Sequence, residues 1–210
     1  KGPTYANSFT KDLNNFLLAR SLAEVPDDPT VTPTVFVLDC DGLRTCWEIA
    51  KETASSKRKV SIVIANLRSE KQCLVMRRQI TLLHRKYPSV KVILRTNTTA
   101  NQAMMDLSRE GTVLSAVYLD FCGTYAKYGA SGFNILATTG LLPKQIFTRV
   151  ICTFDKSNER AISYRPDSSS PGADALREQL LHLQSQGYID VDWQKSNMNY
   201  SYASGCSNMW

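Results

Sequence analysis

This sequence has few of the residues that mark metal sites, membrane spans and dinucleotide-binding loops. It contains two histidines and no cysteine pair in C-x-x-C spacing, which argues against a zinc site. No window approaches the ~18 uninterrupted apolar residues of a transmembrane helix, so a membrane span is excluded. A single glycine, Gly42, follows the first strongly apolar run, so the three-glycine fingerprint of dinucleotide-binding loops is absent as well.

The cysteines and the N-terminal residues bear on the cellular location. Scattered cysteines are typical of reduced thiols, so we expect an intracellular protein; they are Cys40, Cys46, Cys73, Cys122, Cys152 and Cys206. The N-terminal KGPTYANSF has neither an initiator Met nor the apolar core of a secretion signal. We therefore expect a trimmed end from which any targeting segment has been removed.

The composition is that of a globular protein with an excess of basic residues. With 210 residues, 43% hydrophobic and 21% charged, the chain can bury one good core. The net charge of +6 and the pI near 9.0 favour RNA, because basic proteins attract phosphate. The alternative is a solvated basic face, since two of the clusters Lys57-Arg58-Lys59, Arg77-Arg78 and His84-Arg85-Lys86 lie near predicted helix ends.

Short apolar runs alternate with helical periodicity over most of the chain. After a predicted helix at 7–22, a linker rich in proline divides residues 1–33 from a domain at 34–210. Apolar runs of this kind are typical of parallel strands buried on both faces, and they indicate an α/β, Rossmann-like, doubly wound sheet with helices on both faces. The predicted strands are 35–38, 60–65, 90–94 and 113–119, and the predicted helices are 45–53, 70–87 and 100–109.

The last third has a different pattern. A helix at 133–140, a fifth buried strand at 146–154 and an amphipathic helix at 173–186 are expected in turn. Apolar and polar residues then alternate around Ala203-Ser204-Gly205, which predicts an antiparallel C-terminal hairpin. The sheet is therefore expected to be mostly parallel, with an antiparallel end.

Polar residues follow most of the predicted strands, at the edge where ligands bind in open α/β sheets. For Asp39-Cys40-Asp41-Gly42, two interpretations are open. Gly42 either lets the backbone approach a ligand next to a helix N-terminus, or belongs to a tight turn in which Asp41 caps the helix. A single glycine cannot cradle a pyrophosphate as three do, so a dinucleotide ligand is disfavoured.

The order of these segments resembles the class I S-adenosylmethionine-dependent methyltransferases. The resemblance runs from about Thr34 to Trp210 and rests on a strand followed by DCDGLRT, strands ending IAN and LDFCGTY, and LLPKQIFTRVICTF before the terminal pair. It implies S-adenosylmethionine as cofactor and the following residues at its site: Asp39, Asp41, Gly42 and Leu43 beneath the cofactor, Asn66 at the ribose, Asn97 and Thr98 near the adenine, and Asp120 and Phe121 beside the transferred methyl group.

The same resemblance implies that substrate residues follow the fourth strand: Cys122, Gly123, Thr124 and Tyr125. Asp120 could orient or deprotonate an acceptor nitrogen. Cys122 is either a thiolate nucleophile, as in methyltransferases acting on pyrimidine carbon, or an ordinary buried cysteine. GLRT together with TYANSFTKDL also resembles the tRNA guanine dimethyltransferases, with Asn7, Lys11 and Asp12 matching their motif, which implies tRNA modification.

The sequence also departs from this family pattern. The first loop has one glycine, the segment DFCG lacks a proline-aromatic signature, and Asn66 stands where an acid is usual. An amide makes only part of the bidentate ribose contact of a carboxylate. A catalytically inactive methyltransferase-like subunit, binding RNA or scaffolding a complex, is therefore an alternative.

A third alternative is a phosphatase of the haloacid dehalogenase type. In that family a strand ends in D-x-D-G, with the first acid as nucleophile and the second as general acid, and Asp39 and Asp41 match this spacing. Leu43-Arg44 follow in place of the family's Thr-Leu, and no later pair of aspartates completes a magnesium site. Trp47 is expected to pack in the core and His84 to face solvent.

Overall fold

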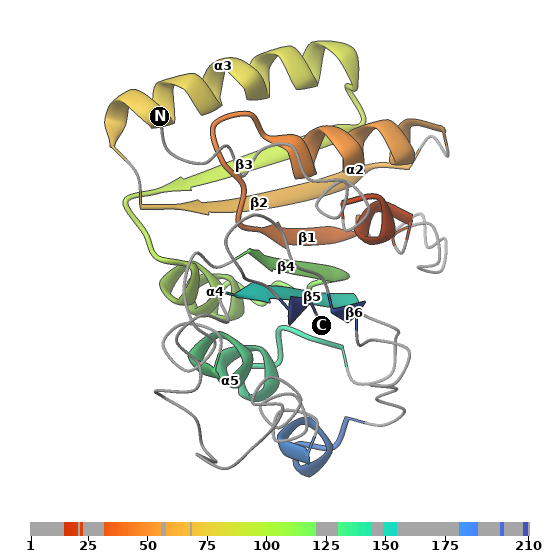
Figure 1. Cartoon of the computed structure of the whole chain (residues 1–210), viewed down its shortest axis with the longest axis vertical. Helices are drawn as coiled ribbons and strands as arrows, with labels where there is room; N and C mark the ends of the chain where they lie inside the picture. The colour runs from red at the N-terminus through yellow and green to blue at the C-terminus, as the bar shows by residue number, and fades with distance from the viewer. Residues whose placement is uncertain are drawn as a thin grey trace.

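The protein folds as a central sheet between two layers of helices (Figure 1). This computed structural model describes residues 15–20, 22, 32–55, 58–67, 69–120, 130–143, 149–154, 181–188, 198–199 and 208–209. The strands are β1 (Thr34–Val37), β2 (Val60–Asn66), β3 (Val90–Thr96), β4 (Ala116–Asp120), β5 (Arg149–Phe154), β6 (Met198–Asn199) and β7 (Asn208–Met209). The helices are α2 (Arg44–Ser55), α3 (Glu70–Lys86), α4 (Ala100–Arg109) and α5 (Ala130–Thr138).

The sheet confirms the predicted Rossmann-like architecture. Strands β3, β2, β1 and β4 lie side by side in that order and run parallel, and β5 continues the sheet in parallel beside β4. Strand β7 then pairs antiparallel with both β5 and β6. The segment joining β6 to β7 is outside the described residues, so the C-terminal hairpin stays a prediction.

Alternate side chains of strands β1 to β4 enter two separate cores. Val35 and Val37 of β1 pack with α2, α3 and the short helix at 15–20, whereas Phe36 packs with α4 and α5. This alternation follows from the two-residue period of a strand, and it requires apolar residues at successive positions. The apolar runs therefore predicted helices on both faces correctly, as Figure 1 shows with α2 and α3 on one side and α4 and α5 on the other.

Several element boundaries differ from the expected ones. Strand β4 begins at Ala116, not at Val113, because Val113 is exposed and the N–H of Leu114 donates to Leu141 O. Helix α5 begins at Ala130, three residues before the predicted start. Of the expected helix at 7–22, residues 15–20 and 22 are helical, and 7–14 are outside the described residues. Of the one at 173–186, residues 181–185 are helical, and 173–180 likewise fall outside.

His84 does not face solvent as expected. Its Nε2 accepts the Val92 N–H at 3.0 Å, so the ring lies against the outer edge of β3 and satisfies a backbone donor there. An edge strand presents unpaired backbone groups, and a side chain that covers one of them protects the edge. Trp47 packs as expected, with its ring edge-on to Tyr87 at 6.0 Å. Within the described residues, no helix combines the length and the apolar character of a membrane span.

Candidate functional site

The strand order reverses between β1 and β4, and the predicted acids lie at this point. The chain builds the sheet outward from β1 through β2 to β3, then crosses to place β4 on the other side of β1. Val37 is paired with Tyr118, and the Leu38 N–H donates to Tyr118 O at 3.0 Å. Asp39 and Asp120 follow directly along the two strands, at the carboxyl edge where ligands bind in this type of sheet.

Asp39 holds the turn between β1 and α2. Its Oδ1 accepts the Cys40 N–H at 2.9 Å, and its Oδ2 accepts the N–H of Cys46, the third residue of α2, at 3.0 Å. The free N–H groups of a helix start need such acceptors, and a negative charge also suits the helix dipole. The sequence suggested Asp41 for capping, but the Cys46 N–H is bound by Asp39.

Electrostatic interactions couple the residues of this turn. Loss of water around the half-buried Asp39 carboxyl raises its pKa, the N–H donors Cys46 and Cys40 act against the rise, and the charge of Asp120 adds to it. Burial raises the pKa of the Cys46 thiol well above its usual value, and the neighbouring Asp39 charge raises it further. Asp120 therefore lies close enough for its charge to act on the Asp39 carboxyl.

The sequence suggested that Gly42 both shapes the turn and leaves room for a ligand. In the structure, Leu43 has the unusual backbone conformation, and the open space lies beside Gly42. Leu43 has a φ of 49°, a left-handed conformation that is uncommon for a residue with a side chain, and it is held there by complete burial of that side chain. Gly42 is exposed and has no positive φ, and a Cβ added to it would meet no atom of the described residues within 4 Å. These residues therefore do not require a glycine at position 42, and they leave the space beside it open.

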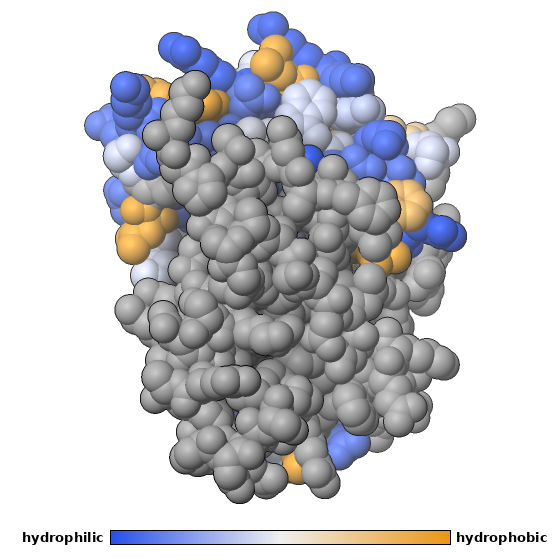
Figure 2. All heavy atoms as spheres, viewed as in Figure 1, coloured by the Kyte–Doolittle hydropathy of each residue, from blue (hydrophilic) through white to orange (hydrophobic). Residues whose placement is uncertain are grey.

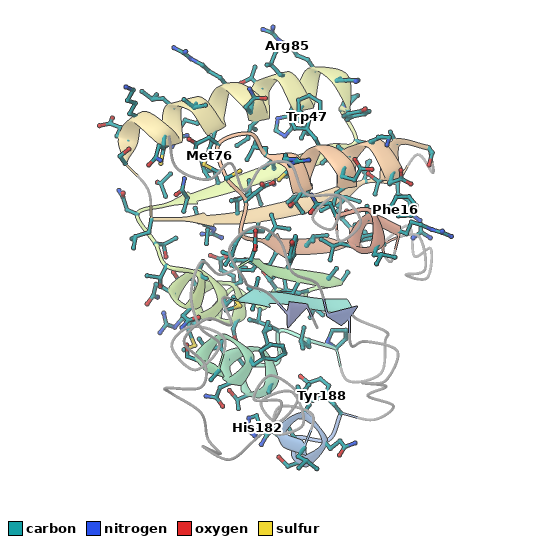
Figure 3. All side chains as sticks on the ribbon, viewed as in Figure 1. Phe16, Trp47, Met76, Arg85, His182 and Tyr188 are labelled. Carbon is teal, nitrogen blue, oxygen red and sulfur yellow. The ribbon has the colours of Figure 1, made fainter. Side chains whose placement is uncertain are left out.

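At the end of β2, Asn66 is turned into the protein. The residue is 4% exposed, and its Nδ2 contacts Met76 Sδ and, at 3.7 Å, Cys73 Sγ, both on α3. Figure 3 shows Met76 pointing from α3 toward the sheet. The side chain of Asn66 thus binds α3 in this conformation, and its expected place at a ribose stays a prediction.

The end of β3 lies beside the end of β2. The Thr98 N–H donates to Asn66 O at 3.4 Å, so the backbone joins two of the predicted ligand-binding segments. Asn97 is exposed in a left-handed turn with a φ of 55°, and Thr99 caps α4 by accepting the Gln102 N–H at 3.2 Å. Asparagine is among the few residues that adopt this turn readily.

Asn101 was not predicted as a site residue. It lies in the first turn of α4, where its Nδ2 donates to Ser131 Oγ at 2.8 Å and so joins α4 to α5. Its Oδ1 is buried and has no hydrogen-bond partner among the residues that the structure describes. The only sequence signal for it was a polar residue in the first turn of a predicted helix that follows a strand.

The remaining predicted site residues are outside the described part of the chain. These are Phe121, Cys122, Gly123, Thr124 and Tyr125, and the tRNA-type residues Asn7, Lys11 and Asp12. Asp41 lies in the β1–α2 turn, half-buried. Among the residues that are described, no three His, Cys, Asp or Glu side chains gather closely enough to hold a metal ion.

Comparisons with known proteins identify the fold. No family model matches the chain, and no curated protein matches it. Among solved structures, the SAH-bound methyltransferase PaMTH1 of Podospora anserina is similar over 97% of this chain and 78% of its own, with 15% sequence identity and a TM-score of 0.51. At this identity the similarity shows the fold alone. The chain has an α/β, Rossmann-like fold similar to that of a methyltransferase.

Proposed function

We propose that the protein binds S-adenosylmethionine at the carboxyl edge of β1 and β4 and transfers its methyl group. One observation carries this proposal. At the point of strand reversal, Asp39 and Asp120 lie near each other, and the space beside Gly42 is open. The fold is shared with a methyltransferase whose structure contains SAH.

The chemistry of these residues fits the cofactor at this edge. S-adenosylmethionine carries a positive sulfonium and a positive ammonium group, and two neighbouring carboxylates attract cations. Asp39 uses one lone pair on each oxygen for a backbone N–H, and each carboxylate oxygen has a second lone pair for a ligand donor. The open side of Gly42 allows close approach of a ligand to the backbone.

Other residues would surround the adenosine. Asn97 and Thr98 lie at the end of β3, and the buried Oδ1 of Asn101 is an acceptor without a donor, as the exocyclic amine of adenine requires. Asn66 fits less well at the ribose, because its amide is bound to α3. We therefore assign ribose contact to the backbone at the end of β2 and not to the Asn66 side chain.

When bound, the cofactor supplies an electrophilic methyl group. Such a transfer needs chiefly an acceptor held in line at attack distance. Asp120 ends β4 beside the proposed methyl donor and would accept a proton from an acceptor nitrogen. For the acceptor we propose RNA, on the basis of the chain's net charge of +6.

Titration calorimetry with S-adenosylmethionine and SAH tests the proposal, and the decisive variant is Gly42→Val. The open space around Gly42 predicts that this variant folds as the parent does, while its side chain occupies the space meant for the ligand. We expect cofactor affinity to fall roughly tenfold or more. Unchanged affinity would remove the site assignment, and Gly42→Ala gives the graded control.

The orientation of Asn66 favours a second candidate, a methyltransferase-like subunit that has lost the cofactor. In that case no heat is released at millimolar S-adenosylmethionine, yet RNA still binds with a strong salt dependence. If the cofactor does bind, incubation with a radiolabelled methyl donor and either RNA or protein shows which class of molecule is methylated. Label in protein but not in RNA would overturn the RNA proposal and leave methyl transfer intact.

The phosphatase alternative is not proposed. Both oxygens of Asp39 accept backbone N–H groups, which lowers the nucleophilicity on which that reaction depends. The described residues also offer no cluster for magnesium.

A further inference from the structure

The outer face of α3 combines exposed apolar side chains with cations. Among the described residues six large apolar side chains are exposed, and four of them lie on α3 or just before it: Leu67 at 68%, Leu74 at 53%, Val75 at 39% and Leu82 at 49%. Single exposed apolar residues are normal on a protein surface, whereas several gathered on one element are typical of an interaction site. Figure 2 shows hydrophobic and hydrophilic side chains interleaved along the rim over α3.

The spacing places these residues on one face of the helix. Lys71, Arg78 and Arg85 follow one another at intervals of seven residues, which is about two helical turns. Val75 and Leu82 are also separated by seven residues. Cys73, Met76 and Leu83 occupy the opposite face and are buried against the sheet. Figure 3 shows the two directions, with Met76 pointing toward the sheet and Arg85 away from it. We call Lys71, Leu74, Val75, Arg78, Leu82 and Arg85 the outer face of α3.

Much of the charge excess of the protein lies on this helix. Helix α3 carries five Lys or Arg side chains and one Glu, a net charge of +4 against +6 for the whole chain. Lys86 stacks over the rings of Trp47 and Tyr87 at 5.9 and 5.3 Å. Lys71, Arg77, Arg78 and Arg85 have no ion-pair partner within the part of the chain that the structure describes.

We propose that the outer face of α3 binds a partner protein through an acidic amphipathic helix. Carboxylates of that helix would neutralise Lys71, Arg78 and Arg85, while its aliphatic side chains would cover Leu74, Val75 and Leu82. Complementary charge sets the orientation of such a pair, and the apolar strip supplies contact area. This inference concerns a surface separate from the proposed methyl-transfer site.

The other occupants fit this face less well. Single-stranded RNA is bound through aromatic stacking as well as cations, and the exposed side chains of this face include no aromatic ring. Double-stranded RNA offers phosphates to the cations but no apolar surface to Leu74, Val75 and Leu82. Interfacial helices insert a broad apolar face into lipid, but the broad apolar face of α3 already packs on the sheet. A second copy of the chain would bring the same unpaired cations of two α3 helices together.

Binding of a synthetic peptide tests the chemistry directly. The probe is an amphipathic helix with one leucine stripe flanked by glutamates, and its affinity is measured by fluorescence anisotropy. We expect Arg78→Glu with Arg85→Glu to weaken binding roughly tenfold or more, and Leu74→Ser with Leu82→Ser to do the same. The matched control is Arg109→Glu on α4, which should leave the affinity unchanged.

Photo-crosslinking in cells tests whether the face is used. A crosslinking amino acid replaces Thr81, which is exposed on α3, and in the control it replaces Thr138, which is exposed on α5. Both hydroxyls donate to a carbonyl in the preceding turn, so the two replacements remove the same kind of bond. We expect protein crosslinks from position 81 alone, at an acidic helical segment of the partner, lost in the Arg78→Glu, Arg85→Glu variant.

Four results would overturn the proposal. They are crosslinks of position 81 to RNA, stronger binding to phosphatidylserine vesicles than to the acidic peptide, self-association that depends on Leu74 and Leu82, and no binding by any probe. None of these results bears on the affinity for S-adenosylmethionine. Failure of this proposal and failure of the proposed function are therefore distinguishable.

Discussion

The turns after β1 and β2 start from similar sequence and place their polar residues in different directions. Asp39 and Asn66 both come at the end of an apolar strand on the same edge of the sheet. Asp39 caps the following helix at the carboxyl edge, beside Asp120, whereas the amide of Asn66 is buried against two sulfur atoms of α3. The residue type after a strand therefore predicts its position along the chain, but not the direction of its side chain.

Replacing Asn66 by Asp tests this contrast most strongly. A carboxylate at this buried position would face sulfur atoms, which are weak hydrogen-bond donors or none at all. We expect the free energy of unfolding at neutral pH to fall by about 3 kcal/mol, measured by urea denaturation. The control is Asn97→Asp at the exposed end of β3, with an expected change within about 0.5 kcal/mol. Unchanged stability together with tighter cofactor binding in Asn66→Asp would instead place this side chain at the ribose.

Thiol labelling compares the same two turns without altering either. Cys40 is exposed in the first turn, whereas Cys46 and Cys73 are buried. We expect iodoacetamide to modify Cys40 roughly tenfold faster or more, because reaction of a buried thiol waits for local opening, and the raised pKa of Cys46 slows it further. Peptide mass spectrometry gives the rate at each site. Comparable rates at Cys40 and Cys73 would contradict the burial of Cys73 on α3, where it contacts Asn66.

Removing the Asp39 carboxylate, which caps α2, is expected to lower the stability of the protein moderately. Asp39→Ala leaves the N–H groups of Cys40 and Cys46 without this acceptor, so we expect a loss of about 1 kcal/mol in the free energy of unfolding. Asp39→Asn keeps one acceptor oxygen and should lose roughly half as much. Chemical denaturation measures both variants. An alanine variant as stable as the parent would show that the cap contributes nothing to stability.

The smallest predicted effect concerns the proximity of Asp39 and Asp120. The folded-state pKa of Asp39 is raised above its ordinary 3.8, so its protonated form favours the folded protein. That contribution is complete below pH 3.8 and is lost as the pH rises through the folded-state value.

Asp120→Asn removes one cause of the rise, so the pKa of Asp39 should fall. The carboxyl carbon shift in an NMR titration measures it directly. A pKa of Asp39 that stays the same in this variant would separate the two carboxylates and weaken the case for a shared site.

The fold was largely predictable because the sheet is buried on both faces. Runs such as Val60–Ala65 leave no polar face for solvent, which requires helices on both sides and therefore parallel strands with crossovers. The start of β4 was missed because Val113 is apolar yet exposed, and periodicity alone cannot distinguish an apolar residue before a strand from one within it. The predicted bounds of α4, Ala100–Arg109, agree with the structure. Thr99 caps the start of this helix, and a turn that contains Gly111 follows its end.

The candidate site was predictable in position and less so in detail. The two strand ends on one edge of the sheet predicted that Asp39 lies near Asp120, and the effect of the Asp120 charge on the pKa of Asp39 supports that prediction. The sequence did not reveal that Asp39 rather than Asp41 accepts the Cys46 N–H, since either acid is near enough along the chain. It did not reveal Asn101 either, because its partner Ser131 is thirty residues away.

The sequence by itself determined the alternation of strands and helices, the basic charge and the order of polar residues along one sheet edge, because each of these depends on local pattern or composition. Only the tertiary structure decided which side chains at that edge face outward, that His84 covers the edge of β3, and that the helix face with the cations and aliphatic residues of α3 is exposed. These outcomes depend on which element packs against which, and a side chain's direction is fixed by neighbours that are distant in the chain.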